Sequence, residues 1–241
     1  MDGHDLLPSL DRRRFMVGAA GLTFALGVPS SFAAGAAKAN AKEAVVNPWV
    51  TIASDGTISI MSPAAEMGQG SLTSLPLILA EELDAKWSHV RIVPAPPINA
   101  IFKNPAYGIM YTSGSNAVRA YWKPVRQFGA QVRKVLIANA ARHWNVDVAE
   151  LITASSVVIH EKTGRRLGYG AIAAFAEIPA SAPAVKDDEL KPASRFRLIG
   201  KDVMRVDMPS KVNGTARYSI DVELPGMLYG EILRSSEAHA K

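Results

Sequence analysis

Two short loops in the sequence carry residue types that could bind a charged ligand. The first is Glu-Met-Gly-Gln-Gly at residues 66–70, between a strand-like run at 57–61 and a helix-like run at 75–83. Two glycines around an amide at such a junction let the backbone approach a polyanion, with free N–H groups at the helix start. The same pattern occurs in plain tight turns, so by itself it leaves a turn and a cofactor site both open.

The second loop, residues 105–115, is rich in tyrosine, glycine and hydroxyl groups. It stands directly before the clearest helical pattern of the chain, which begins near Val118 and runs to about Trp144. Hydroxyls, a glycine and a helix N-terminus are groups with which proteins bind anions. We therefore expect a second anion-binding loop here.

Other ionisable residues have simpler structural interpretations. Glu81, Glu82 and Asp84 resemble a catalytic carboxylate cluster, but their spacing puts them on the polar side of an amphipathic helix, where we expect solvent. The five histidines show no ligand spacing, and we expect His160, at a strand end, to lie on the surface. Because the sequence has no cysteine, this chain carries no disulfide, thiolate metal site or iron–sulfur cluster of its own.

Length and composition set the broad class. With 241 residues, 48% of them hydrophobic, the chain can bury a substantial core in one or two domains. Its net charge of +5 is not gathered into a Lys/Arg stripe with interleaved aromatics, which argues against nucleic-acid binding. A basic balance suits an anionic cofactor or an acidic partner.

The elements that must position these loops begin with a hairpin. Asp55-Gly56 between β-rich runs at 49–52 and 57–60 is a strong hairpin signal. After the first loop, Ser71 or Thr73 can cap a helix that has Pro76 in its first turn. A short helix is expected at 171–176. Further strands are predicted from β-rich runs at 90–93, 156–160, 166–169, 197–200, 216–220 and 227–233.

The amino terminus has the layout of an export signal. Arg12, Arg13 and Arg14 precede an uncharged, mostly apolar run at 15–28, which Pro29 and several small residues follow. The run is shorter than the roughly 20 residues of a bilayer span. We expect twin-arginine export to the periplasm with cleavage near 33–36, and the alternative is an uncleaved amphipathic anchor.

Several of these motifs together resemble those of one enzyme family. Residues 207–228 resemble the opening of the hammerhead domain of the xanthine dehydrogenase and aldehyde oxidase family. Residues 66–70 with 80–84, and 112–115 before the long helix, resemble that family's molybdopterin-binding domain. This order, behind a twin-arginine signal, is similar to the large subunits of isoquinoline 1-oxidoreductases and periplasmic aldehyde dehydrogenases. The resemblance covers residues 47–241.

The resemblance implies an α+β fold, in which a portion of a mixed α/β molybdopterin-binding domain is followed by the beginning of an α+β hammerhead domain. The expected division is an export signal at 1–36, a leader at 37–46, the cofactor domain portion at 47–178, a linker at 179–194 and an incomplete hammerhead at 195–241.

The resemblance also assigns cofactor contacts. It implies that the first loop contacts the molybdopterin through Met67, Gly68, Gln69 and Gly70. The second loop would contact the phosphates through Thr112, Gly114, Ser115 and Asn116. The family often has a second serine where this chain has Ala117, so one hydroxyl contact is missing. The implied cofactor contains molybdenum, with molybdopterin cytosine dinucleotide as its expected form.

The reaction implied is hydroxylation of an aldehyde or an electron-poor heteroaromatic carbon, with water as the oxygen source. Electrons would pass to iron–sulfur clusters on a small partner subunit, and a cytochrome c subunit is a further candidate partner. The family's glutamate base lies near the carboxyl end of its large subunit, and neither Glu66, Glu81 nor Glu82 matches it. We therefore assign no catalytic residue and expect the chain to be inactive without the remainder of the large subunit.

Two alternatives stay open at the level of sequence. The chain could be a non-catalytic exported module that keeps the fold for partner contact. It could also be the non-functional product of a truncated or frameshifted gene.

Overall fold

The computed structural model describes residues 21–24, 49–98, 102–179, 182–234 and 236. Its helices and two small sheets give the α+β class that the sequence predicts. The chain divides into two compact units, Met1–Arg205 and Val206–Lys241. No helix among the described residues is long and apolar enough to cross a membrane.

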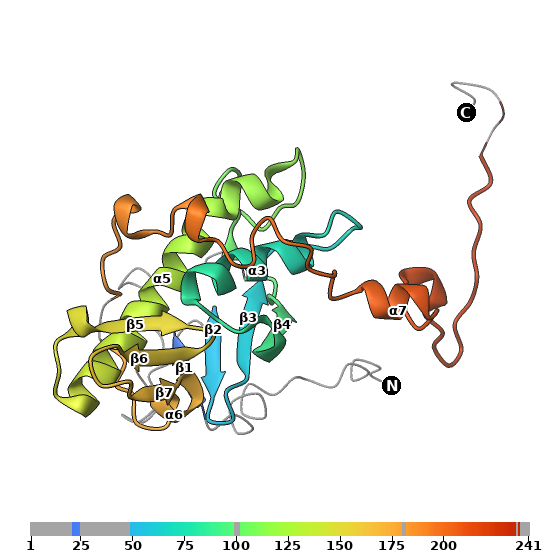
Figure 1. Cartoon of the computed structure of the whole chain (residues 1–241). Helices are drawn as coiled ribbons and strands as arrows, with labels where there is room; N and C mark the ends of the chain where they lie inside the picture. Colours follow the sequence, from blue (N-terminus) through green and yellow to red (C-terminus); the bar gives the residue numbers. More distant parts are fainter. Residues whose placement is uncertain (1–20, 25–48, 99–101, 180–181, 235, 237–241) are drawn as a thin grey trace, which may run out of the picture. The chain divides into compact units, whose positions relative to one another are not determined.

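The first sheet is built on the predicted hairpin (Figure 1). Strands β2 (Val50–Ala53) and β3 (Ile58–Ser62) pair antiparallel, with Ile52 opposite Ile58. Asp55 Oδ1 accepts a 2.8 Å hydrogen bond from the Thr57 N–H, and Gly56 takes φ +89°, a value that glycine adopts without strain. The Asp-Gly hairpin is therefore confirmed.

The sheet has the order β1-β2-β3-β4. The strand β4 (Val90–Pro94), which the short 3₁₀ turn η1 (Trp87–His89) precedes, runs parallel to β3. The strand β1 (Gly21–Phe24) is antiparallel to β2 and lies within the predicted export signal. The expected cleavage region and leader lie outside the described residues.

Two helices cover this sheet and pack against one another. The helix α3 (Ser71–Leu83) links β3 to β4 and packs on both strands, and α5 (Asn116–Trp144) crosses α3. The long helical pattern is thus confirmed to its last residue. The crossing is close because Gly129 has no side chain: a Cβ there would lie 2.4 Å from the Leu79 carbonyl oxygen.

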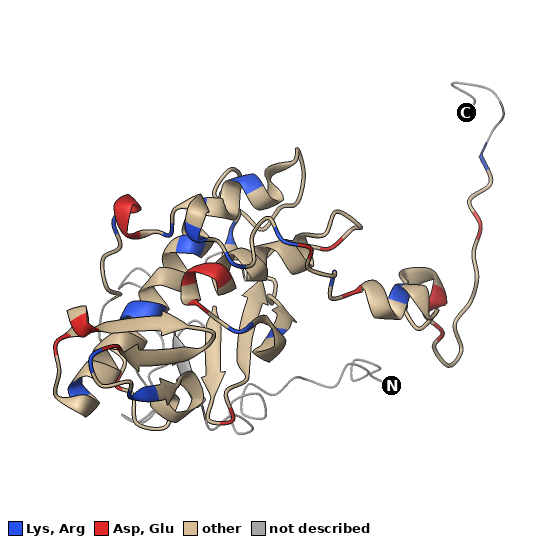
Figure 2. Ribbon diagram, in the orientation of Figure 1, with Lys and Arg blue, Asp and Glu red and all other residues tan. Residues whose placement is uncertain are grey.

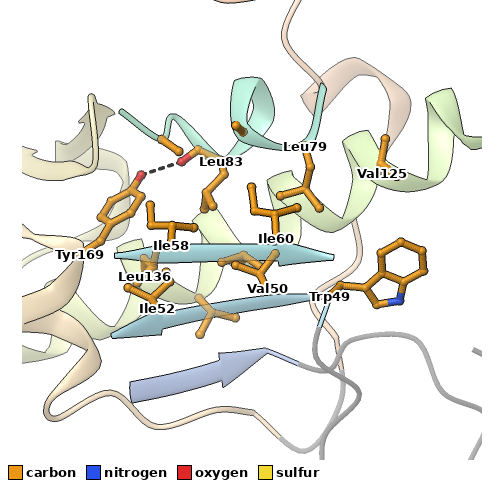
Figure 3. Packing of buried hydrophobic residues seen from close by; sticks show 14 of the residues in the cluster. Trp49, Val50, Ile52, Ile58, Ile60, Leu79, Leu83, Val125, Leu136 and Tyr169 are labelled. Carbon is orange, nitrogen blue, oxygen red and sulfur yellow. Dashed lines mark hydrogen bonds between the residues drawn. The ribbon is translucent and has the colours of Figure 1, made fainter. Parts of the chain in front are cut away.

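The core lies between the sheet and these two helices (Figure 3). Alternate residues of the hairpin, Ile52, Ile58 and Ile60, are fully buried. Trp49 stacks on Phe128 of α5 with ring centroids 4.8 Å apart. Aromatic and branched side chains of this kind supply most of the free energy of burial, at about 25 cal/mol per Å² of apolar surface.

A second sheet follows α5. After the 3₁₀ turn η2 (Val148–Glu150), strands β5 (Leu151–Ala154), β6 (Val157–His160) and β7 (Arg166–Gly168) form an antiparallel meander. The short helix α6 (Tyr169–Ala173) then packs on β2, slightly earlier than the 171–176 predicted.

Two large polar side chains of this part are buried. The Tyr169 hydroxyl donates a 2.7 Å hydrogen bond to the Leu83 carbonyl at the end of α3 (Figure 3), and burial raises its pKa. His160 is also buried, with Nε2 2.7 Å from Glu150 Oε2 and Nδ1 2.8 Å from Thr163 Oγ1. The expectation of a surface histidine was wrong, because Trp144 and β5 cover this strand end.

The carboxylates of α3 do not face solvent. Glu81 and Glu82 are fully buried and Asp84 is 6% exposed, so the prediction of a solvated polar face was wrong. The helix has sheet and core on one side and α5 on another, and a later segment covers the remaining side. We call this segment, residues 187–199, the strap; it contains the 3₁₀ turns η3 (Asp187–Glu189) and η4 (Ala193–Arg195).

The strap overlaps the predicted linker, yet it is firmly bound. Lys191 Nζ lies 3.0 Å from Glu81 and 2.5 Å from Asp84, and it is itself largely buried. Glu81 also accepts the N–H groups of three strap residues, Arg197, Leu198 and Ile199. Basic groups thus meet the acidic end of α3 (Figure 2), so this stretch packs as part of the first unit.

The second unit is small, and its described residues form only short elements. It holds α7 (Met208–Val212) and the 3₁₀ turn η5 (Ser219–Asp221). The strands predicted at 197–200, 216–220 and 227–233 are absent from the described residues, where no strand follows β7. A strand needs a partner for its backbone groups, and none of the described residues pairs with these runs.

Candidate cofactor-binding site

The structure brings the two predicted loops together at the N-terminal ends of α3 and α5. The Ala65 N–H donates a 3.2 Å hydrogen bond to Thr112 Oγ1, which joins segments 47 residues apart in the chain. Met67, Gly68 and Gln69 are exposed on one side of this junction, and Gly114 and Ser115 on the other. Residues that could contact one ligand therefore lie on adjacent loops.

The first loop has an unusual backbone that only glycine adopts readily. Gly68 has φ +107° and Gly70 has φ +84°, both in the left-handed region. A Cβ on Gly68 would meet no atom within 4 Å. The space beside this backbone is therefore open to a flat ligand.

The Gln69 side chain stabilises the loop from within. Its Oε1 accepts the Met67 N–H at 2.7 Å, and its Nε2 donates to the Ala65 carbonyl and to Ser71 Oγ, both at 2.6 Å. Neither Ser71 nor Thr73 caps α3, because the N-cap is Gly70 without a side-chain bond and the helix begins at Ser71. Consequently Pro76 lies beyond the first turn.

A carboxylate already occupies the start of α3. Glu66 accepts the N–H groups of Gly68 at 2.8 Å, Gly70 at 3.0 Å and Leu72 at 2.9 Å. The expectation of free N–H groups at this helix start was therefore wrong. The reason is that an acidic residue four to six positions upstream can fold back and satisfy them.

The surroundings of Glu66 favour its charged form. Partial burial alone would raise the pKa, but the hydrogen bonds from Gly70, Leu72 and Gly68 outweigh burial, and the Arg205 guanidinium adds to them. The pKa of Glu66 is accordingly below its ordinary value. The carboxylate is a fixed negative charge at this loop.

The second loop is organised by a residue that the sequence reasoning missed. Asn104 is fully buried, and its Nδ2 donates to the carbonyls of Tyr111 and Asn116, each at 3.2 Å. Its Oδ1 accepts the Ala106 N–H at 2.9 Å. The Asn-Pro pair at 104–105, a common start of turns, was the available signal.

Tyr107 fixes the far end of this loop. Its hydroxyl donates to the Ser113 carbonyl at 3.1 Å and accepts from Asn116 Nδ2 at 2.9 Å. A Cβ on Gly114 would lie 2.7 Å from that hydroxyl and would displace it, and the positive φ of +56° also favours glycine there. Asn116 Oδ1 in turn accepts two bonds from Arg119, at 3.1 and 2.7 Å.

The donors of this loop suit an anion. Ser115, the N-cap of α5, has φ +57° and its hydroxyl makes no side-chain cap. Within the described residues, neither Ser113 Oγ nor Ser115 Oγ has a hydrogen-bond partner. Two exposed hydroxyls, the N-terminus of a long helix and the nearby Arg119 make this the positive half of the site.

No group of three or more His, Asp or Glu side chains that could hold a metal ion occurs in the described ranges.

Comparison with known proteins agrees with this chemistry. The family described as molybdopterin cofactor-binding domain matches residues 11–215. Isoquinoline 1-oxidoreductase subunit beta of Brevundimonas diminuta is 37% identical over 258 residues, which cover 92% of this chain and 33% of that protein. The membrane-bound aldehyde dehydrogenase [pyrroloquinoline-quinone] of Gluconacetobacter polyoxogenes is 36% identical over 239 residues, which cover 95% of this chain and 30% of that protein.

Among solved structures, a Cu,Mo-CO dehydrogenase in its carbon monoxide reduced state gives a TM-score of 0.39 at 19% identity, over 52% of this chain and 15% of that one. The chain spans about a third of the length of the first two relatives. The family match covers both loops and both helices of the site. The chain therefore belongs to the molybdopterin cofactor-binding domain family.

Proposed function

We propose that this chain binds one side of a molybdopterin cofactor through its two adjacent loops. The pterin would lie against Met67, Gly68, Gln69 and Gly70, and the phosphate end against Thr112, Gly114, Ser115 and Asn116. The observation that carries this proposal is the direct bond between the loops, from Ala65 to Thr112, which puts both sets of residues at one junction.

The residues present fit such a group unequally at its two ends. The loop at α5 offers exposed hydroxyls and a helix N-terminus without a competing carboxylate, as a phosphate requires. The loop at α3 offers open space beside Gly68, while Glu66 already accepts the N–H groups of Gly68, Gly70 and Leu72. Steric access and van der Waals contact would therefore hold the pterin here. When bound, the cofactor would supply the redox chemistry of its molybdenum.

The wider assembly follows from the relatives. We propose that the chain is the amino-terminal part of the cofactor-binding subunit of a molybdenum hydroxylase that oxidises aldehydes or nitrogen heteroaromatics. Two observations support a division of labour: the chain spans about a third of its relatives, and it has no cysteine for iron–sulfur clusters. The catalytic base, the iron–sulfur subunit and any cytochrome c would then be supplied outside this chain.

Export belongs to the same proposal. The arginines at 12–14 and the apolar run after them favour twin-arginine transport to the periplasm, a route that carries proteins with their cofactor inserted. The cytosine dinucleotide form of the cofactor is the expected one.

The test is cofactor retention in the complete assembly. Gly68→Val should lower molybdenum and pterin content at least tenfold, because a branched side chain would fill the open space beside the loop. Gly164→Val is the matched control: it also has a positive φ and no neighbour within 4 Å of its Cβ, but it lies in the β6–β7 turn. Both are measured by elemental analysis and by pterin fluorescence after extraction.

Three results would contradict this proposal. Normal pterin content in the Gly68 variant would place the cofactor elsewhere. Absence of pterin from the unmodified assembly would favour a non-catalytic binding module or a defective gene product. Pyrroloquinoline quinone in the extract, the cofactor in the name of one relative, would overturn the molybdopterin assignment.

A further inference from the structure

The first loop is held by its own first residue, Glu66, together with Arg205, which lies outside both loops. Glu66 engages three backbone N–H groups with its two oxygens: Gly68 and Gly70 at Oε1, Leu72 at Oε2. Bonds to an ionised acceptor are stronger than neutral ones. One carboxylate therefore determines the path of the backbone from the exposed turn into the first turn of α3.

Arg205 completes the pair from the far end of the first unit. Its Nη1 donates to the Gly68 carbonyl at 2.9 Å, and its Nη2 to Glu66 Oε1 at 3.2 Å. The two residues are 139 positions apart, and their side chains are only 31% and 15% exposed. Gly68 is thus held at both its N–H, by Glu66, and its carbonyl, by Arg205.

This arrangement matters because Gln69 bonds to Met67, Ala65 and Ser71, whereas the Gly68 and Gly70 N–H groups and the Gly68 carbonyl are held by Glu66 and Arg205. Met67, Gly68 and Gln69 are exposed, and two of the five residues at 66–70 are glycines with positive φ. Glycine loses the most conformational freedom on ordering. Without the pair, the loop would have to be ordered by the ligand, and the ordering entropy would weaken binding.

We propose that Glu66 and Arg205 are positioning residues for cofactor binding, which hold the Gly68–Gly70 backbone in its binding shape before the ligand arrives. The inference rests on the proposed function. The carboxylate has a second effect: it occupies backbone N–H groups at the start of α3 that the phosphate end of the ligand would otherwise use. That end is left to the loop at α5, so the pair also orients the cofactor.

The experiment compares Glu66→Gln, Glu66→Ala and Arg205→Met with the unmodified chain, and uses Arg142→Met as matched control. Arg142 also forms an ion pair, with Glu177, but both side chains are mostly exposed and remote from the loops in sequence. One arm measures amide hydrogen-exchange protection of Gly68, Gly70 and Leu72 in the full chain. The other measures pterin per protein after co-expression with the remainder of the assembly.

We expect the three amides of the Glu66→Ala variant to lose protection about tenfold each, as for loss of one hydrogen bond of ordinary strength. Arg205→Met should lower amide protection at Gly68 and reduce pterin content by half or more, without a change in its thermal unfolding midpoint. The Arg142→Met control should equal the unmodified chain in all three measurements. Glu66→Gln keeps one acceptor oxygen without the charge, so it should retain part of the protection.

Unchanged protection and unchanged pterin content in both Glu66→Ala and Arg205→Met would overturn the proposal. Lost protection with normal pterin content would overturn it too, since the loop shape would then not matter for binding. If the unmodified assembly contains no pterin while the variants still lose protection, the proposed function fails. The conclusion that Glu66 and Arg205 fix the loop backbone would still be supported. The two failures are therefore distinguishable.

Discussion

A single lysine joins two buried carboxylates at the end of α3. Burial alone would raise the pKa of Glu81 and Asp84, but hydrogen bonds outweigh it, from Leu198 and Lys191 to Glu81 and from Lys191 and Thr153 to Asp84. Both pKa values therefore lie below the ordinary range, so both groups favour the folded state while ionised. That contribution is present at neutral pH and is lost as acid protonates them.

At this scale we predict the effect of removing the lysine. Lys191→Met keeps the aliphatic length but leaves Glu81 and Asp84 without their shared cation, and should reduce the free energy of unfolding by about 3 kcal/mol. Urea titration at neutral pH measures the change. Lys123→Met is the control, because its ion pair with Asp187 is more than half exposed on both sides and is worth about 0–1 kcal/mol. If Lys191→Met and Lys123→Met lower the free energy of unfolding equally, burial of the Lys191 ion pairs adds nothing to stability.

Local spacing could not have revealed these roles. The 3.6-residue period correctly assigned Glu81 and Glu82 to a helix, but their burial depends on Lys191 and Arg197, more than a hundred positions later. Glu66 is a similar case: the sequence placed it in a glycine loop, and its three backbone contacts depend on how the loop folds back. The Ala65–Thr112 hydrogen bond joins the two segments that carry the eight predicted contact residues, and their contact with a cofactor stays a prediction.

At the scale of elements, the crossing of α3 and α5 depends on one missing side chain. A Cβ on Gly129 would lie 2.4 Å from the Leu79 oxygen and 2.9 Å from Glu82 Cβ, both much too close. The two helices approach closely enough for Arg126 to reach Glu82 at 2.7 Å. Helix separation and the buried ion pairs are therefore linked.

We predict that Gly129→Ala lowers the unfolding free energy by about 1–3 kcal/mol, the usual cost of forcing extra volume into a packed core. The intrinsic helix preference points the other way, since alanine is favoured over glycine by about 1 kcal/mol. Ala138→Gly on the exposed side of α5 measures that preference in the same helix. A stabilised Gly129→Ala variant would mean that the helices can separate freely.

Elements with strong local patterns were the ones that sequence could predict. The hairpin at Asp55-Gly56, the helix at 116–144 and the meander after it all carry their signal within a few residues. The runs at 216–220 and 227–233 also alternate like strands, but a sheet is a pairing between segments. A single strand pattern cannot supply its own partner.

At the scale of the molecule, the second unit has apolar side chains without cover. Ile220, Leu228 and Leu233 are 91%, 92% and 97% exposed. Runs of exposed apolar residues mark surfaces that associate. The first unit, by contrast, has a continuous core from the hairpin to α6.

We predict that a chain ending at Arg205 unfolds at the same temperature as the full chain, within about 2 °C, and binds less of a hydrophobic dye. A chain ending at residue 186 should be strongly destabilised, because it lacks the strap that covers Glu81. Calorimetry and dye fluorescence make both comparisons. A fall in stability on removing only residues 206–241 would contradict the independence of the first unit.

The strap also constrains the order in which the protein can fold during its synthesis. Every hydrogen-bond and ion-pair partner described for the Glu81 carboxylate belongs to Lys191, Arg197, Leu198 or Ile199. The ribosome makes α3 more than a hundred residues before it makes these partners. A nascent chain that buried α3 early would enclose an unpaired charge, so the final packing of this helix must wait until translation has passed residue 199.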